Sequence, residues 1–400
     1  MWCERLLCGA ALAAVLGAGT VQGQDIPASV HAVPATILQV LKTFDNPEGS
    51  IFSADGQSVF VSNSAEIGDK GQGFGFTEGE GYISKLAVQP NGTLVMVNER
   101  LIEGLTAPLG MAVLPVATGK FPAGTIFALA GSAPLVDAQG QVVKDPTRLR
   151  TKLIGFNDNG KVLGEIDTGQ GSLFERINGA PIVLINALGF DTEGNAYVAD
   201  TAFGADQFDP PFAGKSGLWL IPHGALDALA DGQEPSEAPV FIEIPGNPDG
   251  VEVSPVDGKI YVNTVGPVGG APDPADGGIY ALTKDDIANN KLPPPVDGGL
   301  GALDGLDFTA GGAMLNTQIK ADRPNQIYIN CPGKGATTLA LEPGGTSSDL
   351  TGPADVAVRR SADGVQLVIV PELFARAANA KTDEVTVLAL PAGFDAACGG

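Results

Sequence analysis

The chain has 400 residues, with 46 Asp or Glu against 23 Lys or Arg, so its formal net charge is −23. Nucleic acids and anionic membrane surfaces bind clustered cations, so this balance argues against either as a partner. The 55 glycines and 30 prolines indicate frequent turns and disfavour a fold built from long helices.

The N-terminus carries an export pattern. Residues 1–23 combine an early basic residue, an apolar run and small residues at the end, which is typical of a secretory signal cleaved after Gly23. A membrane anchor is one alternative, although the run is short and rich in Gly and Ala; a lipoprotein box around Cys8 is another. We expect residues 24–400 to form a single periplasmic or secreted domain that does not insert into a membrane.

Four cysteines occur, and two of them, Cys3 and Cys8, would leave with the signal. In an exported chain, the remaining Cys331 and Cys398 are expected to form one disulfide. A zinc site is the alternative, but these two cysteines and two histidines do not readily supply enough ligands.

Short segments of alternating apolar and polar residues, ended by Gly, Pro, Asn or Asp, fill most of the chain. This pattern predicts an all-β protein. Helical turns are expected only in three short segments, 226–232, 285–292 and 374–381. Representative strand segments are SVFVSN, ISKLAV, TLVMVN, NAYVAD, KIYVNT and QIYINC.

One cassette recurs along the chain, most clearly as FDNPEGSIFS at 44–53 and PGNPDGVEVS at 245–254. Four copies continue into a turn with Asp-Gly or Glu-Gly and a second strand, which predicts β-hairpins. Repeats made only of strands predict propeller blades, here a six-bladed β-propeller. The six copies are NPEGSIF at 46–52, APLGMAV at 107–113, INALGFD at 185–191, NPDGVEV at 247–253, LDGLDFT at 303–309 and GPADVAV at 352–358.

Equivalent cassette positions would converge in such a propeller, because the innermost strands all begin near the central axis. They would ring the mouth of the channel beneath the long loops that follow the second strands, at 64–81, 131–150, 201–216 and 264–278. The six ring positions are Glu48, Leu109, Asn186, Asp249, Asp304 and Ala354.

Three carboxylates and one amide among the ring positions predict a cation site. Crowded carboxylates repel one another unless a cation neutralises them, and a hard divalent ion with oxygen ligands, calcium best, fits this set. No ring position has a thiolate or imidazole, so zinc or copper is less natural. The alternative is that Asp and Asn before Gly are ordinary turn residues.

The motifs PEG, N-x-L-G-F-D and PDG, in this order, resemble those of the family of senescence marker protein (regucalcin), gluconolactonase and luciferin-regenerating enzyme. The resemblance spans roughly residues 44–390, and the stretch 59–113 looks like exported bacterial members. It implies a six-bladed propeller with one catalytic divalent metal on its axis, bound by Glu48, Asn186 and Asp249. It also implies that Asp249 is the general base.

Three features depart from the family pattern. Leu109 stands where the family commonly has Asn, Ala187 stands where Gly is usual, and Asp304 adds a carboxylate, which we count as a fourth candidate ligand. The loop ADQFDPPFAG places Phe208 and Phe212 where they could cover a small organic substrate.

The expected function is therefore hydrolysis of a lactone or related ester by an exported metal-dependent enzyme with a small-molecule substrate. The main alternative, favoured by Leu109, is a non-catalytic propeller that binds a protein or cell-surface ligand and holds any metal structurally. Carbon–nitrogen bond formation, as in strictosidine synthase relatives, is supported only by the shared architecture. The two histidines disfavour a histidine dyad or a Ser-His-Asp triad. The sequence leaves the oligomeric state open.

Overall fold

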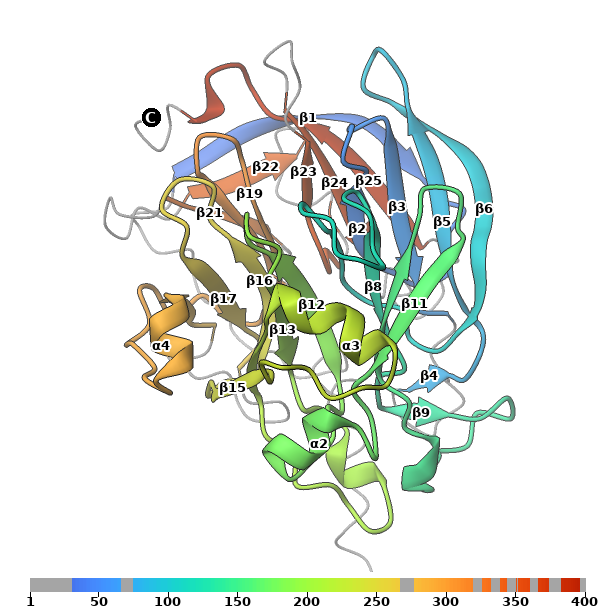
Figure 1. Ribbon diagram of the computed structural model, residues 1–400. Coiled ribbons are helices and arrows are strands. Elements are labelled where there is room, and N and C mark those ends of the chain that lie inside the picture. Colours follow the sequence, from blue (N-terminus) through green and yellow to red (C-terminus); the bar gives the residue numbers. More distant parts are fainter. Residues whose placement is uncertain are drawn as a thin grey trace, which may run out of the picture.

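The computed structural model describes residues 31–65, 75–266, 277–318, 326–331, 339–343, 350, 352–359, 366–373 and 383–395. Its strands form six blades around a central axis, so the predicted all-β six-bladed propeller is confirmed (Figure 1). The predicted signal segment, residues 1–23, lies outside the described residues, and export stays a prediction.

The first three blades each have four described antiparallel strands. Blade 1 contains β2 (Pro47–Phe52), β3 (Ser58–Asn63), β5 (Gly81–Val88) and β6 (Leu94–Leu105). Blade 2 contains β7 (Met111–Val113), β8 (Ile126–Ala130), β10 (Lys152–Phe156) and β11 (Val162–Asp167). Blade 3 contains β12 (Ile185–Phe190), β13 (Ala196–Asp200), β14 (Gly217–Ile221) and β15 (Val240–Glu243).

The last three blades are less uniform. Blade 4 contains β16 (Pro248–Val253), β17 (Ile260–Thr264) and β18 (Ile279–Leu282). Blade 5 contains β19 (Leu303–Phe308), β20 (Met314–Gln318), β21 (Gln326–Asn330) and β22 (Leu339–Pro343). Blade 6 contains β23 (Ala357–Arg359), β24 (Leu367–Glu372) and β25 (Glu384–Ala389), completed by β1 (His31–Leu41).

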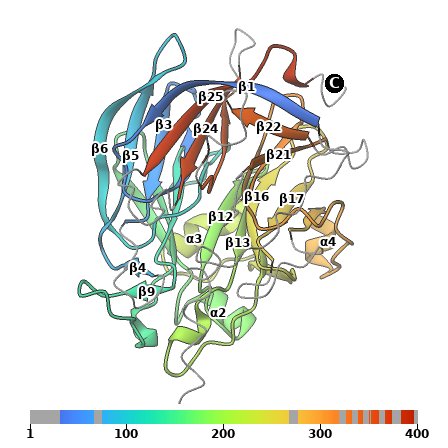
Figure 2. The ribbon, with the colours of Figure 1, turned by 180° about the vertical axis from the view of Figure 1, so that it is seen from behind.

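Strand β1 closes the ring. Its second half pairs antiparallel with β25, from Thr36 opposite Ala389 to Leu41 opposite Val385. Its first half pairs in parallel with β22, so blades 5 and 6 form one continuous sheet, and Figure 2 shows β1 beside both strands. The C-terminal segment VTVLAL is thereby paired with the N-terminal segment ILQVL, and the two ends of the described chain meet in blade 6.

Helices are few and short. The turns expected at 226–232 and 285–292 are present as α3 (Leu226–Ala230) and α4 (Lys284–Ala288), whereas 374–381 lies outside the described residues. Four further short elements were not predicted from the sequence: α2 (Leu173–Asn178) and three 3-10 turns, η1 (Pro146–Arg148), η2 (Ala205–Gln207) and η3 (His223–Ala225). In the described part of the chain, no helix has the length and apolar character needed to cross a bilayer.

The core is divided into clusters between neighbouring blades. Because side chains alternate across a strand, each blade buries both of its faces. In β3, Val59 and Val61 pack toward blade 6, whereas Phe60 packs toward blade 2, where its ring centroid lies 5.8 Å from that of Phe156. The blades are thus fixed in order around the axis by apolar contact on each side.

Four predicted loops lie between the second and third strands of their blades, as expected. Within them, β4 (Phe76–Thr77) and β9 (Leu135–Val136) pair in parallel and join the loops of blades 1 and 2. Figure 1 shows β4, β9 and α2 together at the lower end of the molecule. Parts of two loops, 66–74 and 267–276, lie outside the described residues.

Cassette glycines permit close contact between adjacent innermost strands. A Cβ built on Gly250 would lie 2.6 Å from the carbonyl oxygen of Asp304 and 2.8 Å from the amide nitrogen of Leu306. A Cβ on Gly49 would lie 2.5 Å from the carbonyl oxygen of Leu109. Because these obstacles are backbone atoms, no side-chain rotation relieves the overlap.

We expect Gly250→Ala to lower the free energy of unfolding by about 1–3 kcal/mol, because the added methyl group forces blades 4 and 5 apart. The matched control is Gly224→Ala, where a Cβ would meet nothing within 4 Å and the change should stay within about 0.5 kcal/mol. Urea unfolding of both variants measures the difference. Equal midpoints would show that the central contact does not constrain the ring.

Candidate functional site

Four ring positions occupy the same structural site in their blades, a β-bulge at the start of the innermost strand. In blade 1, Pro47 pairs with Asn63 and Ser50 with Val61, so two residues of β2 face one residue of β3. Strands β12, β16 and β19 repeat this irregularity. Bulges re-aim side chains and occur often beside active sites. The four bulge positions are Glu48, Asn186, Asp249 and Asp304.

The turn before two of these bulges explains the Asn-Pro part of the cassette. Asn46 and Asn247 have φ values of 55° and 57°, in the left-handed region that Asn tolerates better than most residues. Each asparagine accepts a backbone hydrogen bond at its carbonyl oxygen, from Ser64 and Val265 respectively, both 3.0 Å long. The same local geometry therefore positions the acids that follow, Glu48 in blade 1 and Asp249 in blade 4.

Side chains on the second strands bind the backbone that the bulge leaves unpaired. The Gly49 N–H donates to Ser62 Oγ at 2.7 Å, and the Gly250 N–H donates to Asn263 Oδ1 at 2.8 Å. In blade 5, Thr317 Oγ1 donates to the carbonyl oxygen of Gly305 at 3.2 Å. These contacts hold the bulges in place without using the acidic side chains.

The three ring carboxyl groups are buried and lie close enough to influence one another. Glu48, Asp249 and Asp304 are 6%, 4% and 9% exposed. Burial is the main cause that raises their pKa values, to about 8 for Asp249 and well above the ordinary range for Glu48 and Asp304. The Asp304 carboxyl donates a hydrogen bond to Asp249, and neighbouring negative charges raise the pKa values of Glu48 and Asp304 further.

Asp355 is a fourth acid at the axis, and it was not predicted from the sequence. It follows Ala354, the ring position of blade 6, and stands where most copies of the cassette have glycine. Burial raises its pKa to about 7, although the Ser50 N–H donates to its Oδ2 at 2.8 Å. Its charge also raises the pKa of Glu48. The signal was present in GPADVAV, one residue beyond the aligned position.

The donor chemistry of the ring fits a hard divalent cation. Glu48 Oε2 is buried and has no hydrogen-bond partner, and the half-buried Asn186 offers an amide oxygen donor. Among the described residues, no three His, Cys, Asp or Glu side chains are already gathered so as to hold a metal ion. Binding would therefore require Asp249 and Asp304 to exchange their mutual hydrogen bond for the ion.

Leu109 occupies the ring position of blade 2 and closes that side with apolar surface. It is 2% exposed and packs with Phe76, Ala107, Leu184 and Phe203. This cluster joins the loops of blades 1 and 3 to the ring. A polar residue in place of Leu109 would disrupt its apolar packing. The ring is therefore polar on the side of blades 1, 3, 4 and 5 and apolar at blade 2.

The remaining predicted residues belong to other clusters or lie outside the described part of the chain. Phe208 and Phe212 pack against each other, with ring centroids 5.0 Å apart, in a cluster of loop residues with Leu135. Their contact with a substrate stays a prediction. Cys331 is buried between blades 5 and 6, whereas Cys398 lies outside the described residues, so the disulfide also stays a prediction.

Comparison with known proteins rests on structure. No protein-family profile and no curated protein matches the sequence. The fold is similar to a gluconolactonase from Xanthomonas campestris, at 13% identity over 88% of this chain and 89% of that chain, with a TM-score of 0.50. It is also similar to the PQQ-bound aldose sugar dehydrogenase of Streptomyces coelicolor, at 12% identity over 89% and 98% of the two chains, with a TM-score of 0.54.

A third similar structure is the major allergen Mala s 1 of Malassezia sympodialis, at 15% identity over 88% of this chain and 95% of that chain, with a TM-score of 0.51. The likeness establishes the propeller fold. These three proteins are named as a gluconolactonase, a PQQ-bound dehydrogenase and an allergen, so the fold alone does not assign a reaction.

The buried ring acids predict a pH-dependent stability in the presence of a chelator. A carboxyl group whose pKa is raised in the folded state contributes stability that is complete below its ordinary value, near 4. That contribution is lost as the pH rises through its folded value, about 8 for Asp249. We therefore expect the chelated protein to become less stable from pH 5 to pH 9.

Asp249→Asn should reduce this loss, because the amide keeps the shape of the neutral acid and cannot ionise. Thermal unfolding across the pH range measures the effect, with the exposed Glu243→Gln as the matched control. An Asp249→Asn profile parallel to that of the wild type would contradict the assignment of the buried charge.

Proposed function

We propose that the protein is an exported, metal-dependent hydrolase of a lactone or related ester. A divalent metal, calcium best, is bound at the ring by Glu48, Asn186 and Asp249, with Asp304 as a fourth oxygen ligand. The observation that carries the proposal is the repeated bulge, at which blades 1, 3, 4 and 5 each have an oxygen-bearing residue at the equivalent position of the innermost strand.

The order of these donors along the chain supports the proposal. The sequence resembles the gluconolactonase and regucalcin family in having Glu, Asn and Asp at the first, third and fourth cassettes, and the three fall on equivalent bulges. The buried and unpartnered Glu48 Oε2 supports an ion at this place, because an unsatisfied buried carboxylate oxygen is costly.

The residues of the ring would have separate roles in hydrolysis. The bound metal would supply a Lewis acid that polarises the lactone carbonyl. Asp249 would accept the proton of the attacking water. Asp304 would give up its hydrogen bond to Asp249 and help to hold the ion beside it. The apolar contacts of Leu109 would exclude water from one side of the site.

A non-catalytic propeller is the rival, and Leu109 is the observation that favours it. A binding scaffold needs no polar group at the second blade, and a structural metal could still occupy the other ring positions. Metal binding without hydrolysis is the outcome that separates this rival from the enzyme.

The decisive test compares thermal unfolding of the wild type and of Asp249→Asn, each with a chelator and then with calcium. Calcium at a hundred times its dissociation constant should stabilise the wild type by about 2.7 kcal/mol. The variant should gain much less, because it lacks one anionic ligand, whereas Glu243→Gln should respond as the wild type does.

Hydrolysis is then measured by titrating the acid released from a panel of five- and six-membered lactones and aryl esters. We expect turnover by the wild type, loss of turnover in Asp249→Asn and retention in Glu243→Gln. A calcium response with no turnover on any substrate would favour the scaffold. No response to calcium or another divalent ion would refute the metal-dependent enzyme.

A further inference from the structure

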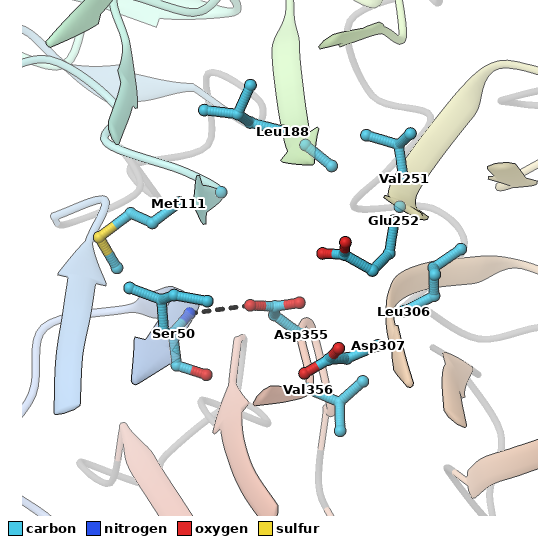
Figure 3. A pocket seen from close by; sticks show the side chains of 13 residues that line it. Ser50, Met111, Leu188, Val251, Glu252, Leu306, Asp307, Asp355 and Val356 are labelled. Atoms are coloured by element: carbon cyan, nitrogen blue, oxygen red, sulfur yellow. Dashed lines mark hydrogen bonds between the residues drawn. The ribbon is translucent and has the colours of Figure 1, made fainter. Parts of the chain in front are cut away.

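A second group of acids lies in the central channel, one step along the inner strands from the ring. A cavity of about 30 Å³ on the axis is lined by thirteen described residues, among them Glu252, Asp307 and Asp355. Figure 3 shows these three carboxyl groups turned toward the same space. None of the thirteen described lining residues is Lys, Arg or His.

The three acids come from consecutive blades and have a regular origin in the sequence. Glu252 and Asp307 each stand three residues after a ring acid, in the repeated segments DGVE and DGLD. Asp355 enters from blade 6, and its Oδ2 accepts the Ser50 N–H of blade 1 across the closure of the ring. Blades 4, 5, 6 and 1 therefore all contribute to one small cavity.

Ser50 supplies an observation independent of the acids. It lines the same cavity, is 3% exposed, and its hydroxyl has no hydrogen-bond partner. A buried hydroxyl without a hydrogen-bond partner is costly. The Ser50 hydroxyl would be satisfied if its oxygen coordinated an ion or if it formed a hydrogen bond with a water molecule bound to that ion. The orphaned hydroxyl and the acids thus point to the same kind of occupant.

We propose that this channel cavity is a second cation site, separate from the ring, which holds one calcium-sized divalent ion together with bound water. The site would link blades 6 and 1, which meet where the propeller closes, to blades 4 and 5. Its role is structural, and it does not depend on the proposed hydrolysis.

The contacts of the acids define how the ion is held. Glu252 Oε1 accepts the Val253 N–H at 2.8 Å. Asp307 accepts at both of its oxygens, Oδ1 from the Phe308 N–H and Oδ2 from the Val358 N–H, each at 2.6 Å. A carboxylate oxygen has further lone pairs, so these bonds orient the groups without exhausting them. Because the oxygens are tethered to separate strands, the ion reaches some of them through water. A volume of about 30 Å³ exceeds the roughly 10–15 Å³ that one water requires.

The test counts the calcium bound per molecule of full-length protein by equilibrium dialysis across a range of free calcium. Four proteins are compared: the wild type, Glu252→Gln/Asp307→Asn, Asp249→Asn and the surface control Glu243→Gln. We expect one equivalent that weakens by about tenfold or more in the double variant and persists in Asp249→Asn and in the control.

The absence of any equivalent with this behaviour would overturn the proposal, whatever the ring site does. Near-ultraviolet circular dichroism establishes whether the double variant is folded. Should it fail to fold, Ser50→Ala decides the question, because it leaves every carboxylate in place. A weakening on the order of tenfold in the equivalent that Asp249→Asn retains would support the site, and an unchanged affinity would overturn it.

Discussion

The structure depends on the close approach of six innermost strands around one axis. Where the strands meet, the backbone of one blade touches the backbone of the next: the Gly110 N–H donates to the carbonyl oxygen of Asn186 at 2.9 Å, and the Gly305 N–H to that of Ala354 at 2.7 Å. A side chain on either glycine would meet atoms of the neighbouring blade at 2.3–2.5 Å. These contacts set the register between blades, so they also set where each ring position lies.

This constraint has an electrostatic consequence. The packing that brings the strands together removes water from the acids that the bulges direct inward, and burial is accordingly the main cause of the raised pKa values of Glu48, Asp249 and Asp304. A structure selected for stability alone would place apolar residues at such positions, as blade 2 does with Leu109. Retaining acids there is typical of a site whose chemistry requires them.

The cassette made much of this arrangement predictable from sequence. Asn-Pro-acid-Gly has a local explanation in the left-handed turn, the bulge and the glycine contact, so its recurrence identified equivalent positions in different blades. Asp355 was missed because alignment by apolar alternation selects one residue per blade, and its neighbour Ala354 took that place. Glu252 and Asp307 were not identified from the sequence, because only the closed propeller brings strands from different blades around a shared cavity.

Other features depended on long-range packing and carried weak sequence signals. Helix α2 was missed because it is a short insertion between blades 2 and 3, although Ser172 caps its first turn and Gly179 ends it in the left-handed conformation. The pairing of β4 with β9 joins loops from two blades, and no local pattern in either loop specifies the partner.

A bulge also explains how one propeller can host different chemistries. The bulged residue lies outside the ladder of paired residues, so its side chain contributes little to the register of the strand. The four bulged residues, Glu48, Asn186, Asp249 and Asp304, can therefore differ in charge and size on similar backbones. The glycine contacts are less permissive, because they are made by the backbone itself. Blade 3 departs from the other bulged blades in two ways. It has Ala187 in place of the cassette glycine. Opposite the bulge, its second strand has Ala199, which lacks the hydroxyl or amide that binds the bulge in blades 1, 4 and 5. Functional variation is thus expected at the bulged side chains, with the fold held constant by the residues that follow them.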